Sequence, residues 1–179
     1  GRAEHDVLLY WPLHDFWHRD GALEQKLTVH KLEWFEPESI GRVAAHLWRQ
    51  GYAFDYVTPH EVSTNLAAHL DERTRMVWIE STTNPLLNVV DIRAAAAAAH
   101  AAGALLVVDN TFATPYLQQP LELGADIVVH STTKYLGGHS DGVGGFTATN
   151  DPTIAERLRF LQKSLGAVPG PFDSWLVLR

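Results

Sequence analysis

The sequence predicts an α/β fold in which a mostly parallel sheet is covered by helices on both faces. Three short apolar runs, rich in β-branched residues, alternate with helical or turn segments between residues 76 and 129. Runs of this length and composition are typical of buried strands in a parallel sheet. A polar cluster directly follows each run. Because ligands bind outside the carboxyl ends of the strands in open α/β sheets, these clusters predict a ligand site at one edge.

Residues 1–50 contribute little to this prediction. They hold four of the six tryptophans and five of the ten histidines, and their apolar positions keep neither a strand period nor a helix period for long. Only Ile40–Gln50 is expected to be helical, ended by Gly51. We therefore leave residues 1–50 unassigned and treat residues 51–179 as part of one domain.

The regular pattern begins with a predicted short helix over Val62–Leu70. The first predicted strand, Met76–Ile79, follows it and is closed by Glu80 and the polar cluster Ser81–Pro85. That cluster contains Asn84, which makes it the first candidate contributor to the ligand site.

A second helix and strand follow directly. Asp91 is a suitable N-cap for an alanine-rich helix over Ile92–Ala102, and Gly103 is a suitable stop. The next strand is predicted over Ala104–Val108, and Asp109 comes directly after it. This order places a carboxylate at the second strand end.

The third strand is predicted over Ile127–Val129 and ends in the polar run His130–Lys134. Since parallel strands end at the same edge of a sheet, we expect Asn84, Asp109 and Ser131–Lys134 to line one crevice.

Composition excludes several classes of protein. The 179 residues include 14 basic and 21 acidic side chains, a net charge of -7, which disfavours nucleic acid as a partner. Without cysteine there is neither a disulfide framework nor a thiolate metal site. No apolar run approaches the roughly 20 residues that span a bilayer, so no membrane partner is expected. A cytoplasmic protein is the expectation.

The lysine in the third polar cluster suggests a specific chemistry. Only four lysines occur beside ten arginines, and Lys134 follows Ser131 and Thr133 at a strand end. A lysine with a lowered pKa presents a neutral amine that forms imines with aldehydes. A carboxylate such as Asp109 can keep a pyridine nitrogen protonated, and the two hydroxyls can bind a phosphate.

Each of these residues also has an ordinary interpretation. A single lysine after a strand is usually a solvated loop residue, and a single aspartate there is usually a turn or cap residue. Asn84-Pro85 alone is a turn signal. The histidines raise metal binding as a rival, but no HExxH pattern is present, and His130 and His139 are expected to be structural. No metal is predicted.

Three motifs in this order resemble a known family. Glu80–Pro85, Val107–Phe112 and above all His130–Asp141 are similar to segments of the cystathionine γ-synthase, γ-lyase and β-lyase enzymes of transsulfuration. The resemblance covers roughly residues 52–179 and includes Gly166–Asp173. It implies the large domain of the type I, aspartate-aminotransferase-like fold and pyridoxal 5'-phosphate (PLP) as cofactor.

The resemblance also implies a role for each candidate residue. Lys134 corresponds to the lysine that binds the cofactor covalently and moves protons between substrate carbons, and Asp109 to the carboxylate at the pyridine nitrogen. The remaining cofactor-binding residues implied are Thr111 at the ring, Asn84 near the phenolic oxygen, and Ser131 and Thr133 at the phosphate.

The reaction implied is elimination or replacement at Cγ or Cβ of a sulfur amino acid or an activated homoserine. The small-molecule substrate would be an amino acid, and the full-length form would be a homo-oligomer, a dimer of dimers. The choice between synthase, lyase and sulfhydrylase branches stays open.

The chain also departs from the family pattern. It has about half the family's length, and the upstream glycine-rich turn, the Tyr-Gly-Gly-Thr segment and the C-terminal small domain have no counterpart in it. We therefore expect the chain by itself to take up PLP weakly and to show little or no activity. The alternative is a non-catalytic remnant that acts only as a structural or interaction module.

Overall fold

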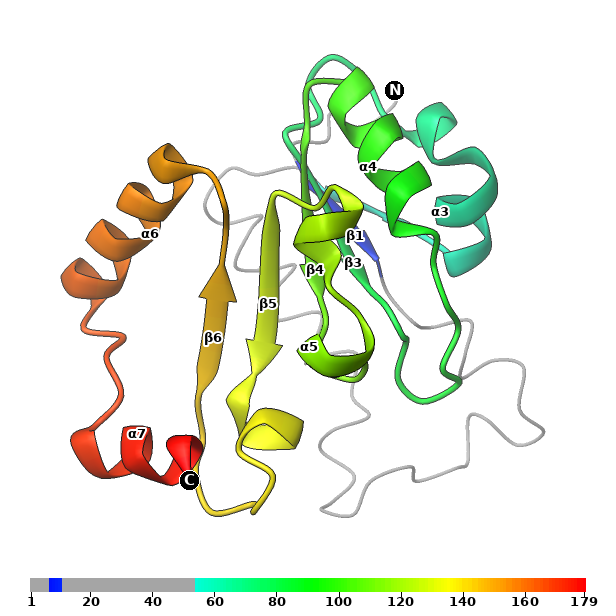
Figure 1. Cartoon of the computed structure of the whole chain (residues 1–179). Coiled ribbons are helices and arrows are strands. Elements are labelled where there is room, and N and C mark those ends of the chain that lie inside the picture. Colours follow the sequence, from blue (N-terminus) through cyan, green and yellow to red (C-terminus); the bar gives the residue numbers. More distant parts are fainter. Residues whose placement is uncertain (1–6, 11–53) are drawn as a thin grey trace.

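The computed structural model describes residues 7–10 and 54–179, which build one six-stranded sheet in the order β2-β1-β3-β4-β5-β6 (Figure 1). The first five strands are parallel, and β6 is antiparallel to β5. The mostly parallel sheet predicted from the sequence is thus confirmed. The strands are β1 Val7–Tyr10, β2 Phe54–Val57, β3 Met76–Glu80, β4 Leu105–Asp109, β5 Ile127–Ser131 and β6 Gly145–Ala148.

The register of the strands brings the predicted polar clusters to one edge. Glu80 of β3 pairs with Asp109 of β4, and Asp109 lies beside Val129 of β5. The predicted strands were right to within two residues, and each observed strand continues one or two residues beyond its predicted apolar run.

Helix α4, Ile92–Ala101, is the predicted alanine-rich helix. The Asp91 side chain accepts a hydrogen bond from the Ala94 backbone N–H at 3.0 Å, as an N-cap should. Gly103, at φ +74°, has the left-handed conformation that commonly ends a helix. The predicted helix and its two boundary signals are therefore confirmed.

The main core lies between α4 and the sheet. Small side chains on α4 let the helix approach the strands closely, and Val77, Leu106 and Val108 fill the space between them. Burying a valine or leucine contributes about 1.5–3 kcal/mol each. The alanines of α4 in this core are Ala95, Ala96 and Ala99.

The helix predicted over Val62–Leu70 starts earlier and consists of two parts. Helix α3 spans Pro59–Asn65 and the 3₁₀ helix η2 spans Leu66–His69. Thr58 and Glu61 form a capping box, in which the Glu61 side chain accepts from the Thr58 N–H at 2.7 Å. This cap, which the apolar pattern does not reveal, moves the helix start to residue 59.

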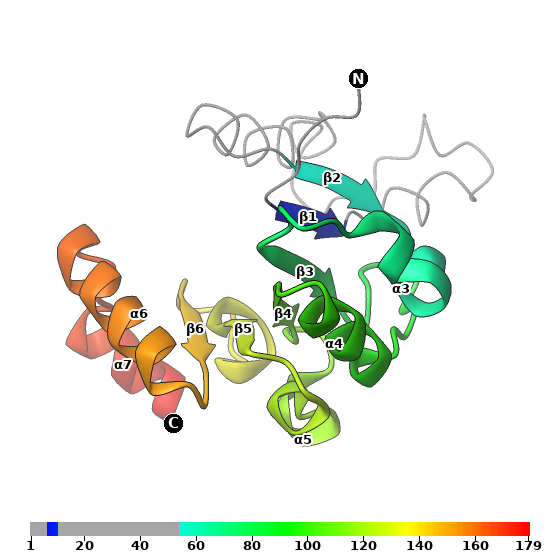
Figure 2. The same cartoon turned by 90° about the horizontal axis from the view of Figure 1, so that it is seen from above.

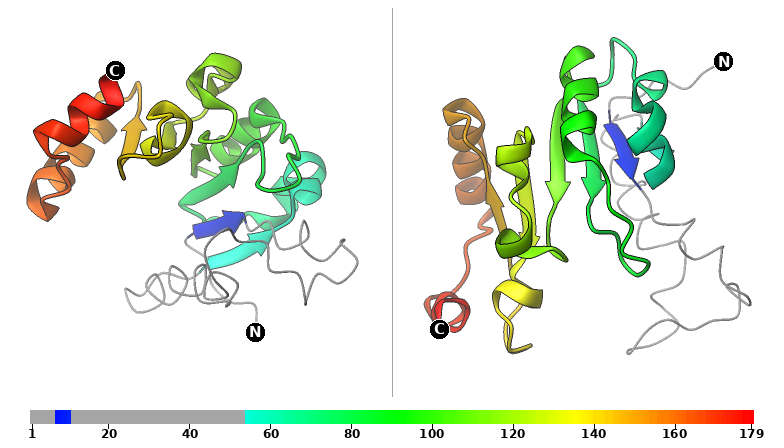
Figure 3. Two further views of the ribbon diagram at one scale, coloured as in Figure 1. Left: turned by 90° about the horizontal axis from the view of Figure 1, so that it is seen from below. Right: turned by 45° about the vertical axis from the view of Figure 1, so that its right-hand side comes forward.

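Helices α3 and α4 lie together on one face of the sheet, while α6, Pro152–Leu165, and α7, Pro171–Leu178, lie beyond β6 (Figures 2 and 3). Asp151 caps α6 by accepting from the Thr153 and Ile154 N–H groups. Short segments complete the described chain: α5 Thr114–Leu117, η3 Pro120–Leu123 and the turn η4 Thr132–Leu136.

Two findings concern the amino-terminal segment. Val7–Tyr10, in the segment left unassigned from sequence, forms β1 between β2 and β3. The helix predicted over Ile40–Gln50 lies outside the described residues.

Candidate cofactor site at the strand ends

Asp109, Thr111 and Ser131 are joined by hydrogen bonds at the edge where β4 and β5 end. The Thr111 hydroxyl accepts from the Ser131 N–H at 2.8 Å, and the Thr111 N–H donates to Asp109 Oδ1 at 3.0 Å. Because Asp109 pairs with Val129, Asp109 and Ser131 lie on the same face of the sheet. The predicted juxtaposition of Asp109 and Ser131 is therefore present in the structure, and Thr111 links the two residues.

Lys134 lies on the turn that follows β5. This turn, η4, is a π-helical turn in which Lys134 has φ -98° and ψ -118°, outside the helical range. The Gly138 N–H donates to the Lys134 carbonyl at 2.8 Å and holds this conformation. The Lys134 side chain is exposed, so its amine is accessible at the edge that also holds Ser131.

Thr133 binds the loop that returns toward β6. Its hydroxyl accepts from the Gly144 N–H at 3.0 Å and lies 3.3 Å from the Gly144 carbonyl oxygen. The Thr132 N–H donates to that same carbonyl at 3.0 Å. The turn that carries Lys134 is therefore fixed to Gly144 from two consecutive residues.

Gly144 has a steric reason to be glycine. A Cβ atom there would lie 2.6 Å from Thr132 Oγ1, a distance that real side chains do not show. Gly142, two residues earlier, has open space at the same position. The structure thus gives Gly144 a specific packing role.

Asn84 lies at the same end of the strands as the other candidate residues, but in a separate loop. It lies exposed in the loop after β3. That loop is closed by hydrogen bonds of its own, since the Val90 N–H donates to Ser81 Oγ at 3.2 Å and the Asn88 N–H to Thr83 Oγ1 at 2.9 Å. Asn84 is thus at the correct edge, but no described contact joins it to Asp109.

His130 is a buried residue directly behind the edge. It is 4% exposed, and its Nδ1 has no hydrogen-bond partner among the described residues. Burial lowers the pKa of His130, and the nearby Asp109 carboxylate partly opposes that shift. Within residues 7–10 and 54–179, no cluster of three metal-ligating side chains is found.

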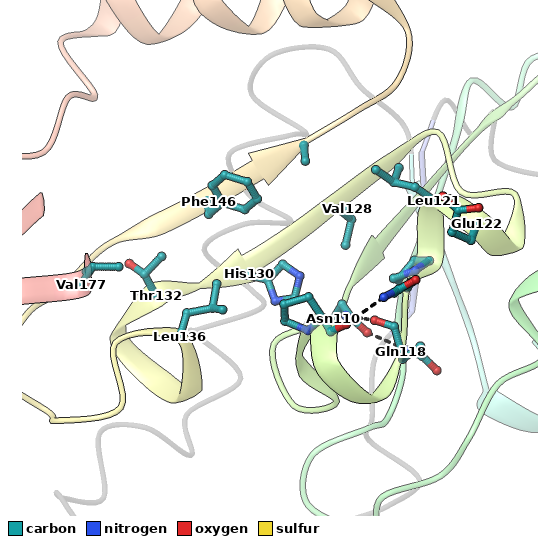
Figure 4. Close-up of a pocket in the computed structure, with 14 residues that line it drawn as sticks. Asn110, Gln118, Leu121, Glu122, Val128, His130, Thr132, Leu136, Phe146 and Val177 are labelled. Atoms are coloured by element: carbon teal, nitrogen blue, oxygen red, sulfur yellow. Dashed lines mark hydrogen bonds between the residues drawn. The ribbon is translucent and has the colours of Figure 1, made fainter. Parts of the chain in front are cut away.

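A cavity of about 490 Å³ lies on the other face of the same strands (Figure 4). Val128 and His130 line it, and they alternate along β5 with Val129 and Ser131, which point to the face of Asp109. The cavity is mainly apolar, with Leu136 and Phe146 in its wall. It is therefore separate from the edge that carries the predicted cofactor residues.

Comparison with known proteins identifies the family. A family model described as "Cys/Met metabolism PLP-dependent enzyme" matches residues 40–179. The chain belongs to this family. The PLP-dependent transsulfuration resemblance seen in the motifs is confirmed, and the match begins upstream of residue 52, where the motif resemblance began.

Three curated members of the family are named for three different activities. A cystathionine gamma-lyase of Dictyostelium discoideum is 61% identical over 108 residues, covering 60% of this chain and 28% of the relative. A probable cystathionine gamma-synthase of Herpetosiphon aurantiacus is 51% identical over 129 residues, 72% of this chain and 40% of the relative. A cystathionine beta-lyase of Lactococcus lactis is 53% identical over 133 residues, 74% of this chain and 35% of the relative.

The fold agrees with a solved member of the family. The crystal structure of cystathionine gamma-lyase from Lactobacillus plantarum, complexed with L-serine, superimposes with a TM-score of 0.74 at 40% identity, covering 78% of this chain and 36% of that one. The chain therefore spans between about a quarter and two fifths of the length of the relatives named above.

The residues at the strand ends fit the cofactor of this family. The edge offers a carboxylate for a pyridine nitrogen, hydroxyl groups for a phosphate and an accessible amine for an aldehyde, on Asp109, Ser131 and Lys134. Sequence reasoning found these residues from their types and positions. It did not find the residues behind them, notably Asn110, Gln118 and Gly144, because their importance lies in contacts with distant parts of the chain.

Proposed function

We propose that the whole protein is a PLP-dependent transsulfuration enzyme that acts on a sulfur amino acid or an activated homoserine by elimination or replacement at Cγ or Cβ. The observation that carries the proposal is the arrangement of Asp109 and Ser131 on one face of adjacent strand ends, followed by Lys134 on an exposed turn. PLP, when bound, withdraws electrons from the substrate's reacting carbons.

Each residue has a defined task in this proposal. The Lys134 amine would bind the cofactor aldehyde and carry protons between substrate carbons, and Asp109 would keep the pyridine nitrogen protonated. Thr111 supports the ring side of the site. Ser131 and Thr133 would hold the phosphate, and Asn84 would contact the phenolic oxygen. Thr133 donates its single hydroxyl hydrogen either to Gly144 or to a phosphate.

The domain assignment is part of the proposal. Residues 51–179 are assigned to the PLP-binding large domain, residues 1–50 are left unassigned, and no part of residues 51–179 is assigned to the C-terminal small domain. The support is the share of the relatives' length that the chain spans. The chain by itself is therefore expected to bind PLP weakly and to show little or no turnover.

We also propose a cytoplasmic homo-oligomer, a dimer of dimers. The apolar side chains of Phe172, Trp175 and Leu178 on α7 are exposed, which supports burial against further protein. Among the described residues, no helix is long and apolar enough to cross a membrane. Light scattering of the whole protein tests the oligomeric state, and a monomer would contradict it.

Covalent trapping tests the assignment of Lys134. The chain is incubated with PLP at high concentration, reduced with borohydride and digested, and the modified peptide is identified by mass spectrometry. We expect the modification on Lys134 and its loss in Lys134→Ala. Lys163→Ala, which changes an exposed lysine on α6, is the matched control and should leave trapping intact. Undiminished trapping in Lys134→Ala would refute the assignment.

Activity assays on the whole protein separate the branches. Formation of cystathionine and its cleavage are measured side by side, because relatives named for each activity match this chain. If covalent cofactor is present but neither activity is found, the remnant interpretation gains support over the enzyme.

A further inference from the structure

Asn110 follows the candidate Asp109 but turns to the opposite face of the sheet. Its side chain is fully buried, at 0% exposure. The Asn110 amide oxygen accepts from Gln118 Nε2 at 2.7 Å, and the Asn110 Nδ2 donates to the Gln118 carbonyl at 2.9 Å (Figure 4). The oxygen and the nitrogen of the buried Asn110 amide are therefore both hydrogen-bonded to Gln118, eight positions later.

Gln118 extends this pair to a third segment. Its Nε2 also donates to the carbonyl of Ser81, at 2.7 Å, directly after β3. The Ser81 N–H in turn lies 3.3 Å from the carbonyl of Asp109, to which it donates. The Asn110–Gln118 pair thus ties the loop after β3 and the end of β4 to the segment after α5.

The tied segments carry the residues assigned to the cofactor. The Asn110 N–H donates to the Val129 carbonyl at 2.9 Å, which joins the end of β4 to β5. The next residue, Thr111, holds Asp109 Oδ1 through its N–H and the Ser131 N–H through its hydroxyl. A shift of the backbone at residue 110 would therefore be transmitted to the Asp109 carboxylate on the other face.

We propose that Asn110, together with Gln118, is a positioning residue that fixes the direction of the Asp109 carboxylate without touching the cofactor itself. The inference rests on the role proposed for Asp109. A buried amide is suited to this task because its donor and acceptor impose a defined orientation, and losing either partner leaves a buried polar group without a hydrogen bond.

Two variants and a control test the proposal. Asn110→Ala removes both hydrogen bonds, and Gln118→Met removes the Nε2 donor while keeping most of the side-chain volume. Gln119→Met is the matched control, because it is the same chemical change at the adjacent, exposed residue. Each is made in the whole protein with Asp109 and with Asp109→Asn. If Asn110→Ala does not fold, Gln118→Met decides by the same criteria.

The main readout is the pH dependence of the bound cofactor's visible absorption, which reports the charge near the ring and not the stability of the fold. In the Asp109 background, we expect both variants to shift the midpoint of that titration in the same direction as Asp109→Asn and to weaken PLP binding about tenfold, or about 1.4 kcal/mol. In the Asp109→Asn background the additional shift should disappear, because the positioned charge is gone. Gln119→Met should match the parent.

Failure of the positioning role can be distinguished from failure of the proposed function. If the parent protein binds no PLP, or Lys134→Ala still traps it, the proposed function fails. If the parent binds PLP but both variants titrate as Gln119→Met does, with only the unfolding temperature lowered, the positioning role is overturned. Equal shifts with and without the Asp109 carboxylate would overturn it as well.

Discussion

The buried layer under α4 and the carboxyl edge of the same strands are stabilised in different ways. In the layer, Val77, Leu106 and Val108 pack against the helix, and the free energy is spread over many apolar contacts. At the edge, Asp109 and Thr111 are fixed by individual hydrogen bonds of defined length. Stability and chemistry are therefore located a few residues apart on one strand, and substitutions should affect them separately.

The largest expected effect is in the layer. Leu106→Ala removes a fully buried side chain, and we expect the free energy of unfolding to fall by about 2–5 kcal/mol. Leu165→Ala, the same change at an exposed position of α6, should cost less than about 0.5 kcal/mol. Denaturant unfolding followed by circular dichroism measures both. Similar losses in the two variants would mean that the layer is not the main source of stability.

The second-largest effect is expected at the carboxyl ends of the strands, where a substitution should lower turnover with little change in the free energy of unfolding. Asp109→Asn removes a charge but keeps the shape of the side chain. A carboxylate beside a cation shifts the pKa of that cation by about 1–3 units, equivalent to about 1.4–4 kcal/mol. We expect turnover of the whole protein to fall roughly 10- to 1000-fold, with a smaller loss of PLP affinity. A change limited to KM for the amino acid would assign Asp109 to substrate binding instead.

A substitution near the turn that holds Lys134 should affect both stability and chemistry. Gly144→Ala places a Cβ 2.6 Å from Thr132 Oγ1, so either the Thr132 side chain or the turn must shift, and overpacking of this kind costs about 1–3 kcal/mol. We expect slower covalent trapping at Lys134 together with this loss of stability. Gly142→Ala is the control, because nothing lies within 4 Å of its Cβ. If Gly142→Ala slows trapping equally, loop flexibility and not the contact at Gly144 is responsible.

The smallest effect concerns pH. Because burial lowers the pKa of His130 below its ordinary value of 6.5, the unfolded chain binds the proton more tightly than the folded one. The stabilisation from neutral His130 is thus present above about pH 6.5 and lost as the pH falls through the lower folded value. In His130→Leu, the free energy of unfolding should depend less on pH in this range. Denaturant unfolding at several pH values measures this dependence.

The same comparison explains how much the sequence could predict. The α4 helix and its cap follow from neighbouring residues, since Asp91 and Gly103 act within one turn of the helix. The strands and the site residues Asp109 and Ser131 follow from residue type and order along the chain. These are local signals, and they predicted that Asp109 and Ser131 lie at the carboxyl ends of neighbouring strands, as the register shows.

Other features depend on partners that are distant in sequence. Gln118 meets Ser81 across 37 positions, and neither residue type nor spacing indicates this contact. The strand β6 begins at Gly145, in a glycine-rich stretch that resembles a flexible loop, and it exists because β5 offers an antiparallel edge. The importance of Asn110 and Gly144 likewise comes from what they touch, which only the fold reveals.

The position of β1 has a consequence for the order of assembly during translation. Val7 pairs with Phe54 on one side and with Met76 on the other, so β1 precedes its two neighbours by 47 (54 − 7) and 69 (76 − 7) residues. At synthesis rates of about 5–20 residues per second, roughly 3–14 s pass before β3 has been made. Pairings over such separations also close slowly because of loop entropy. The nascent Val7–Tyr10 segment therefore has neither of its pairing partners until β2 and β3 have been synthesised.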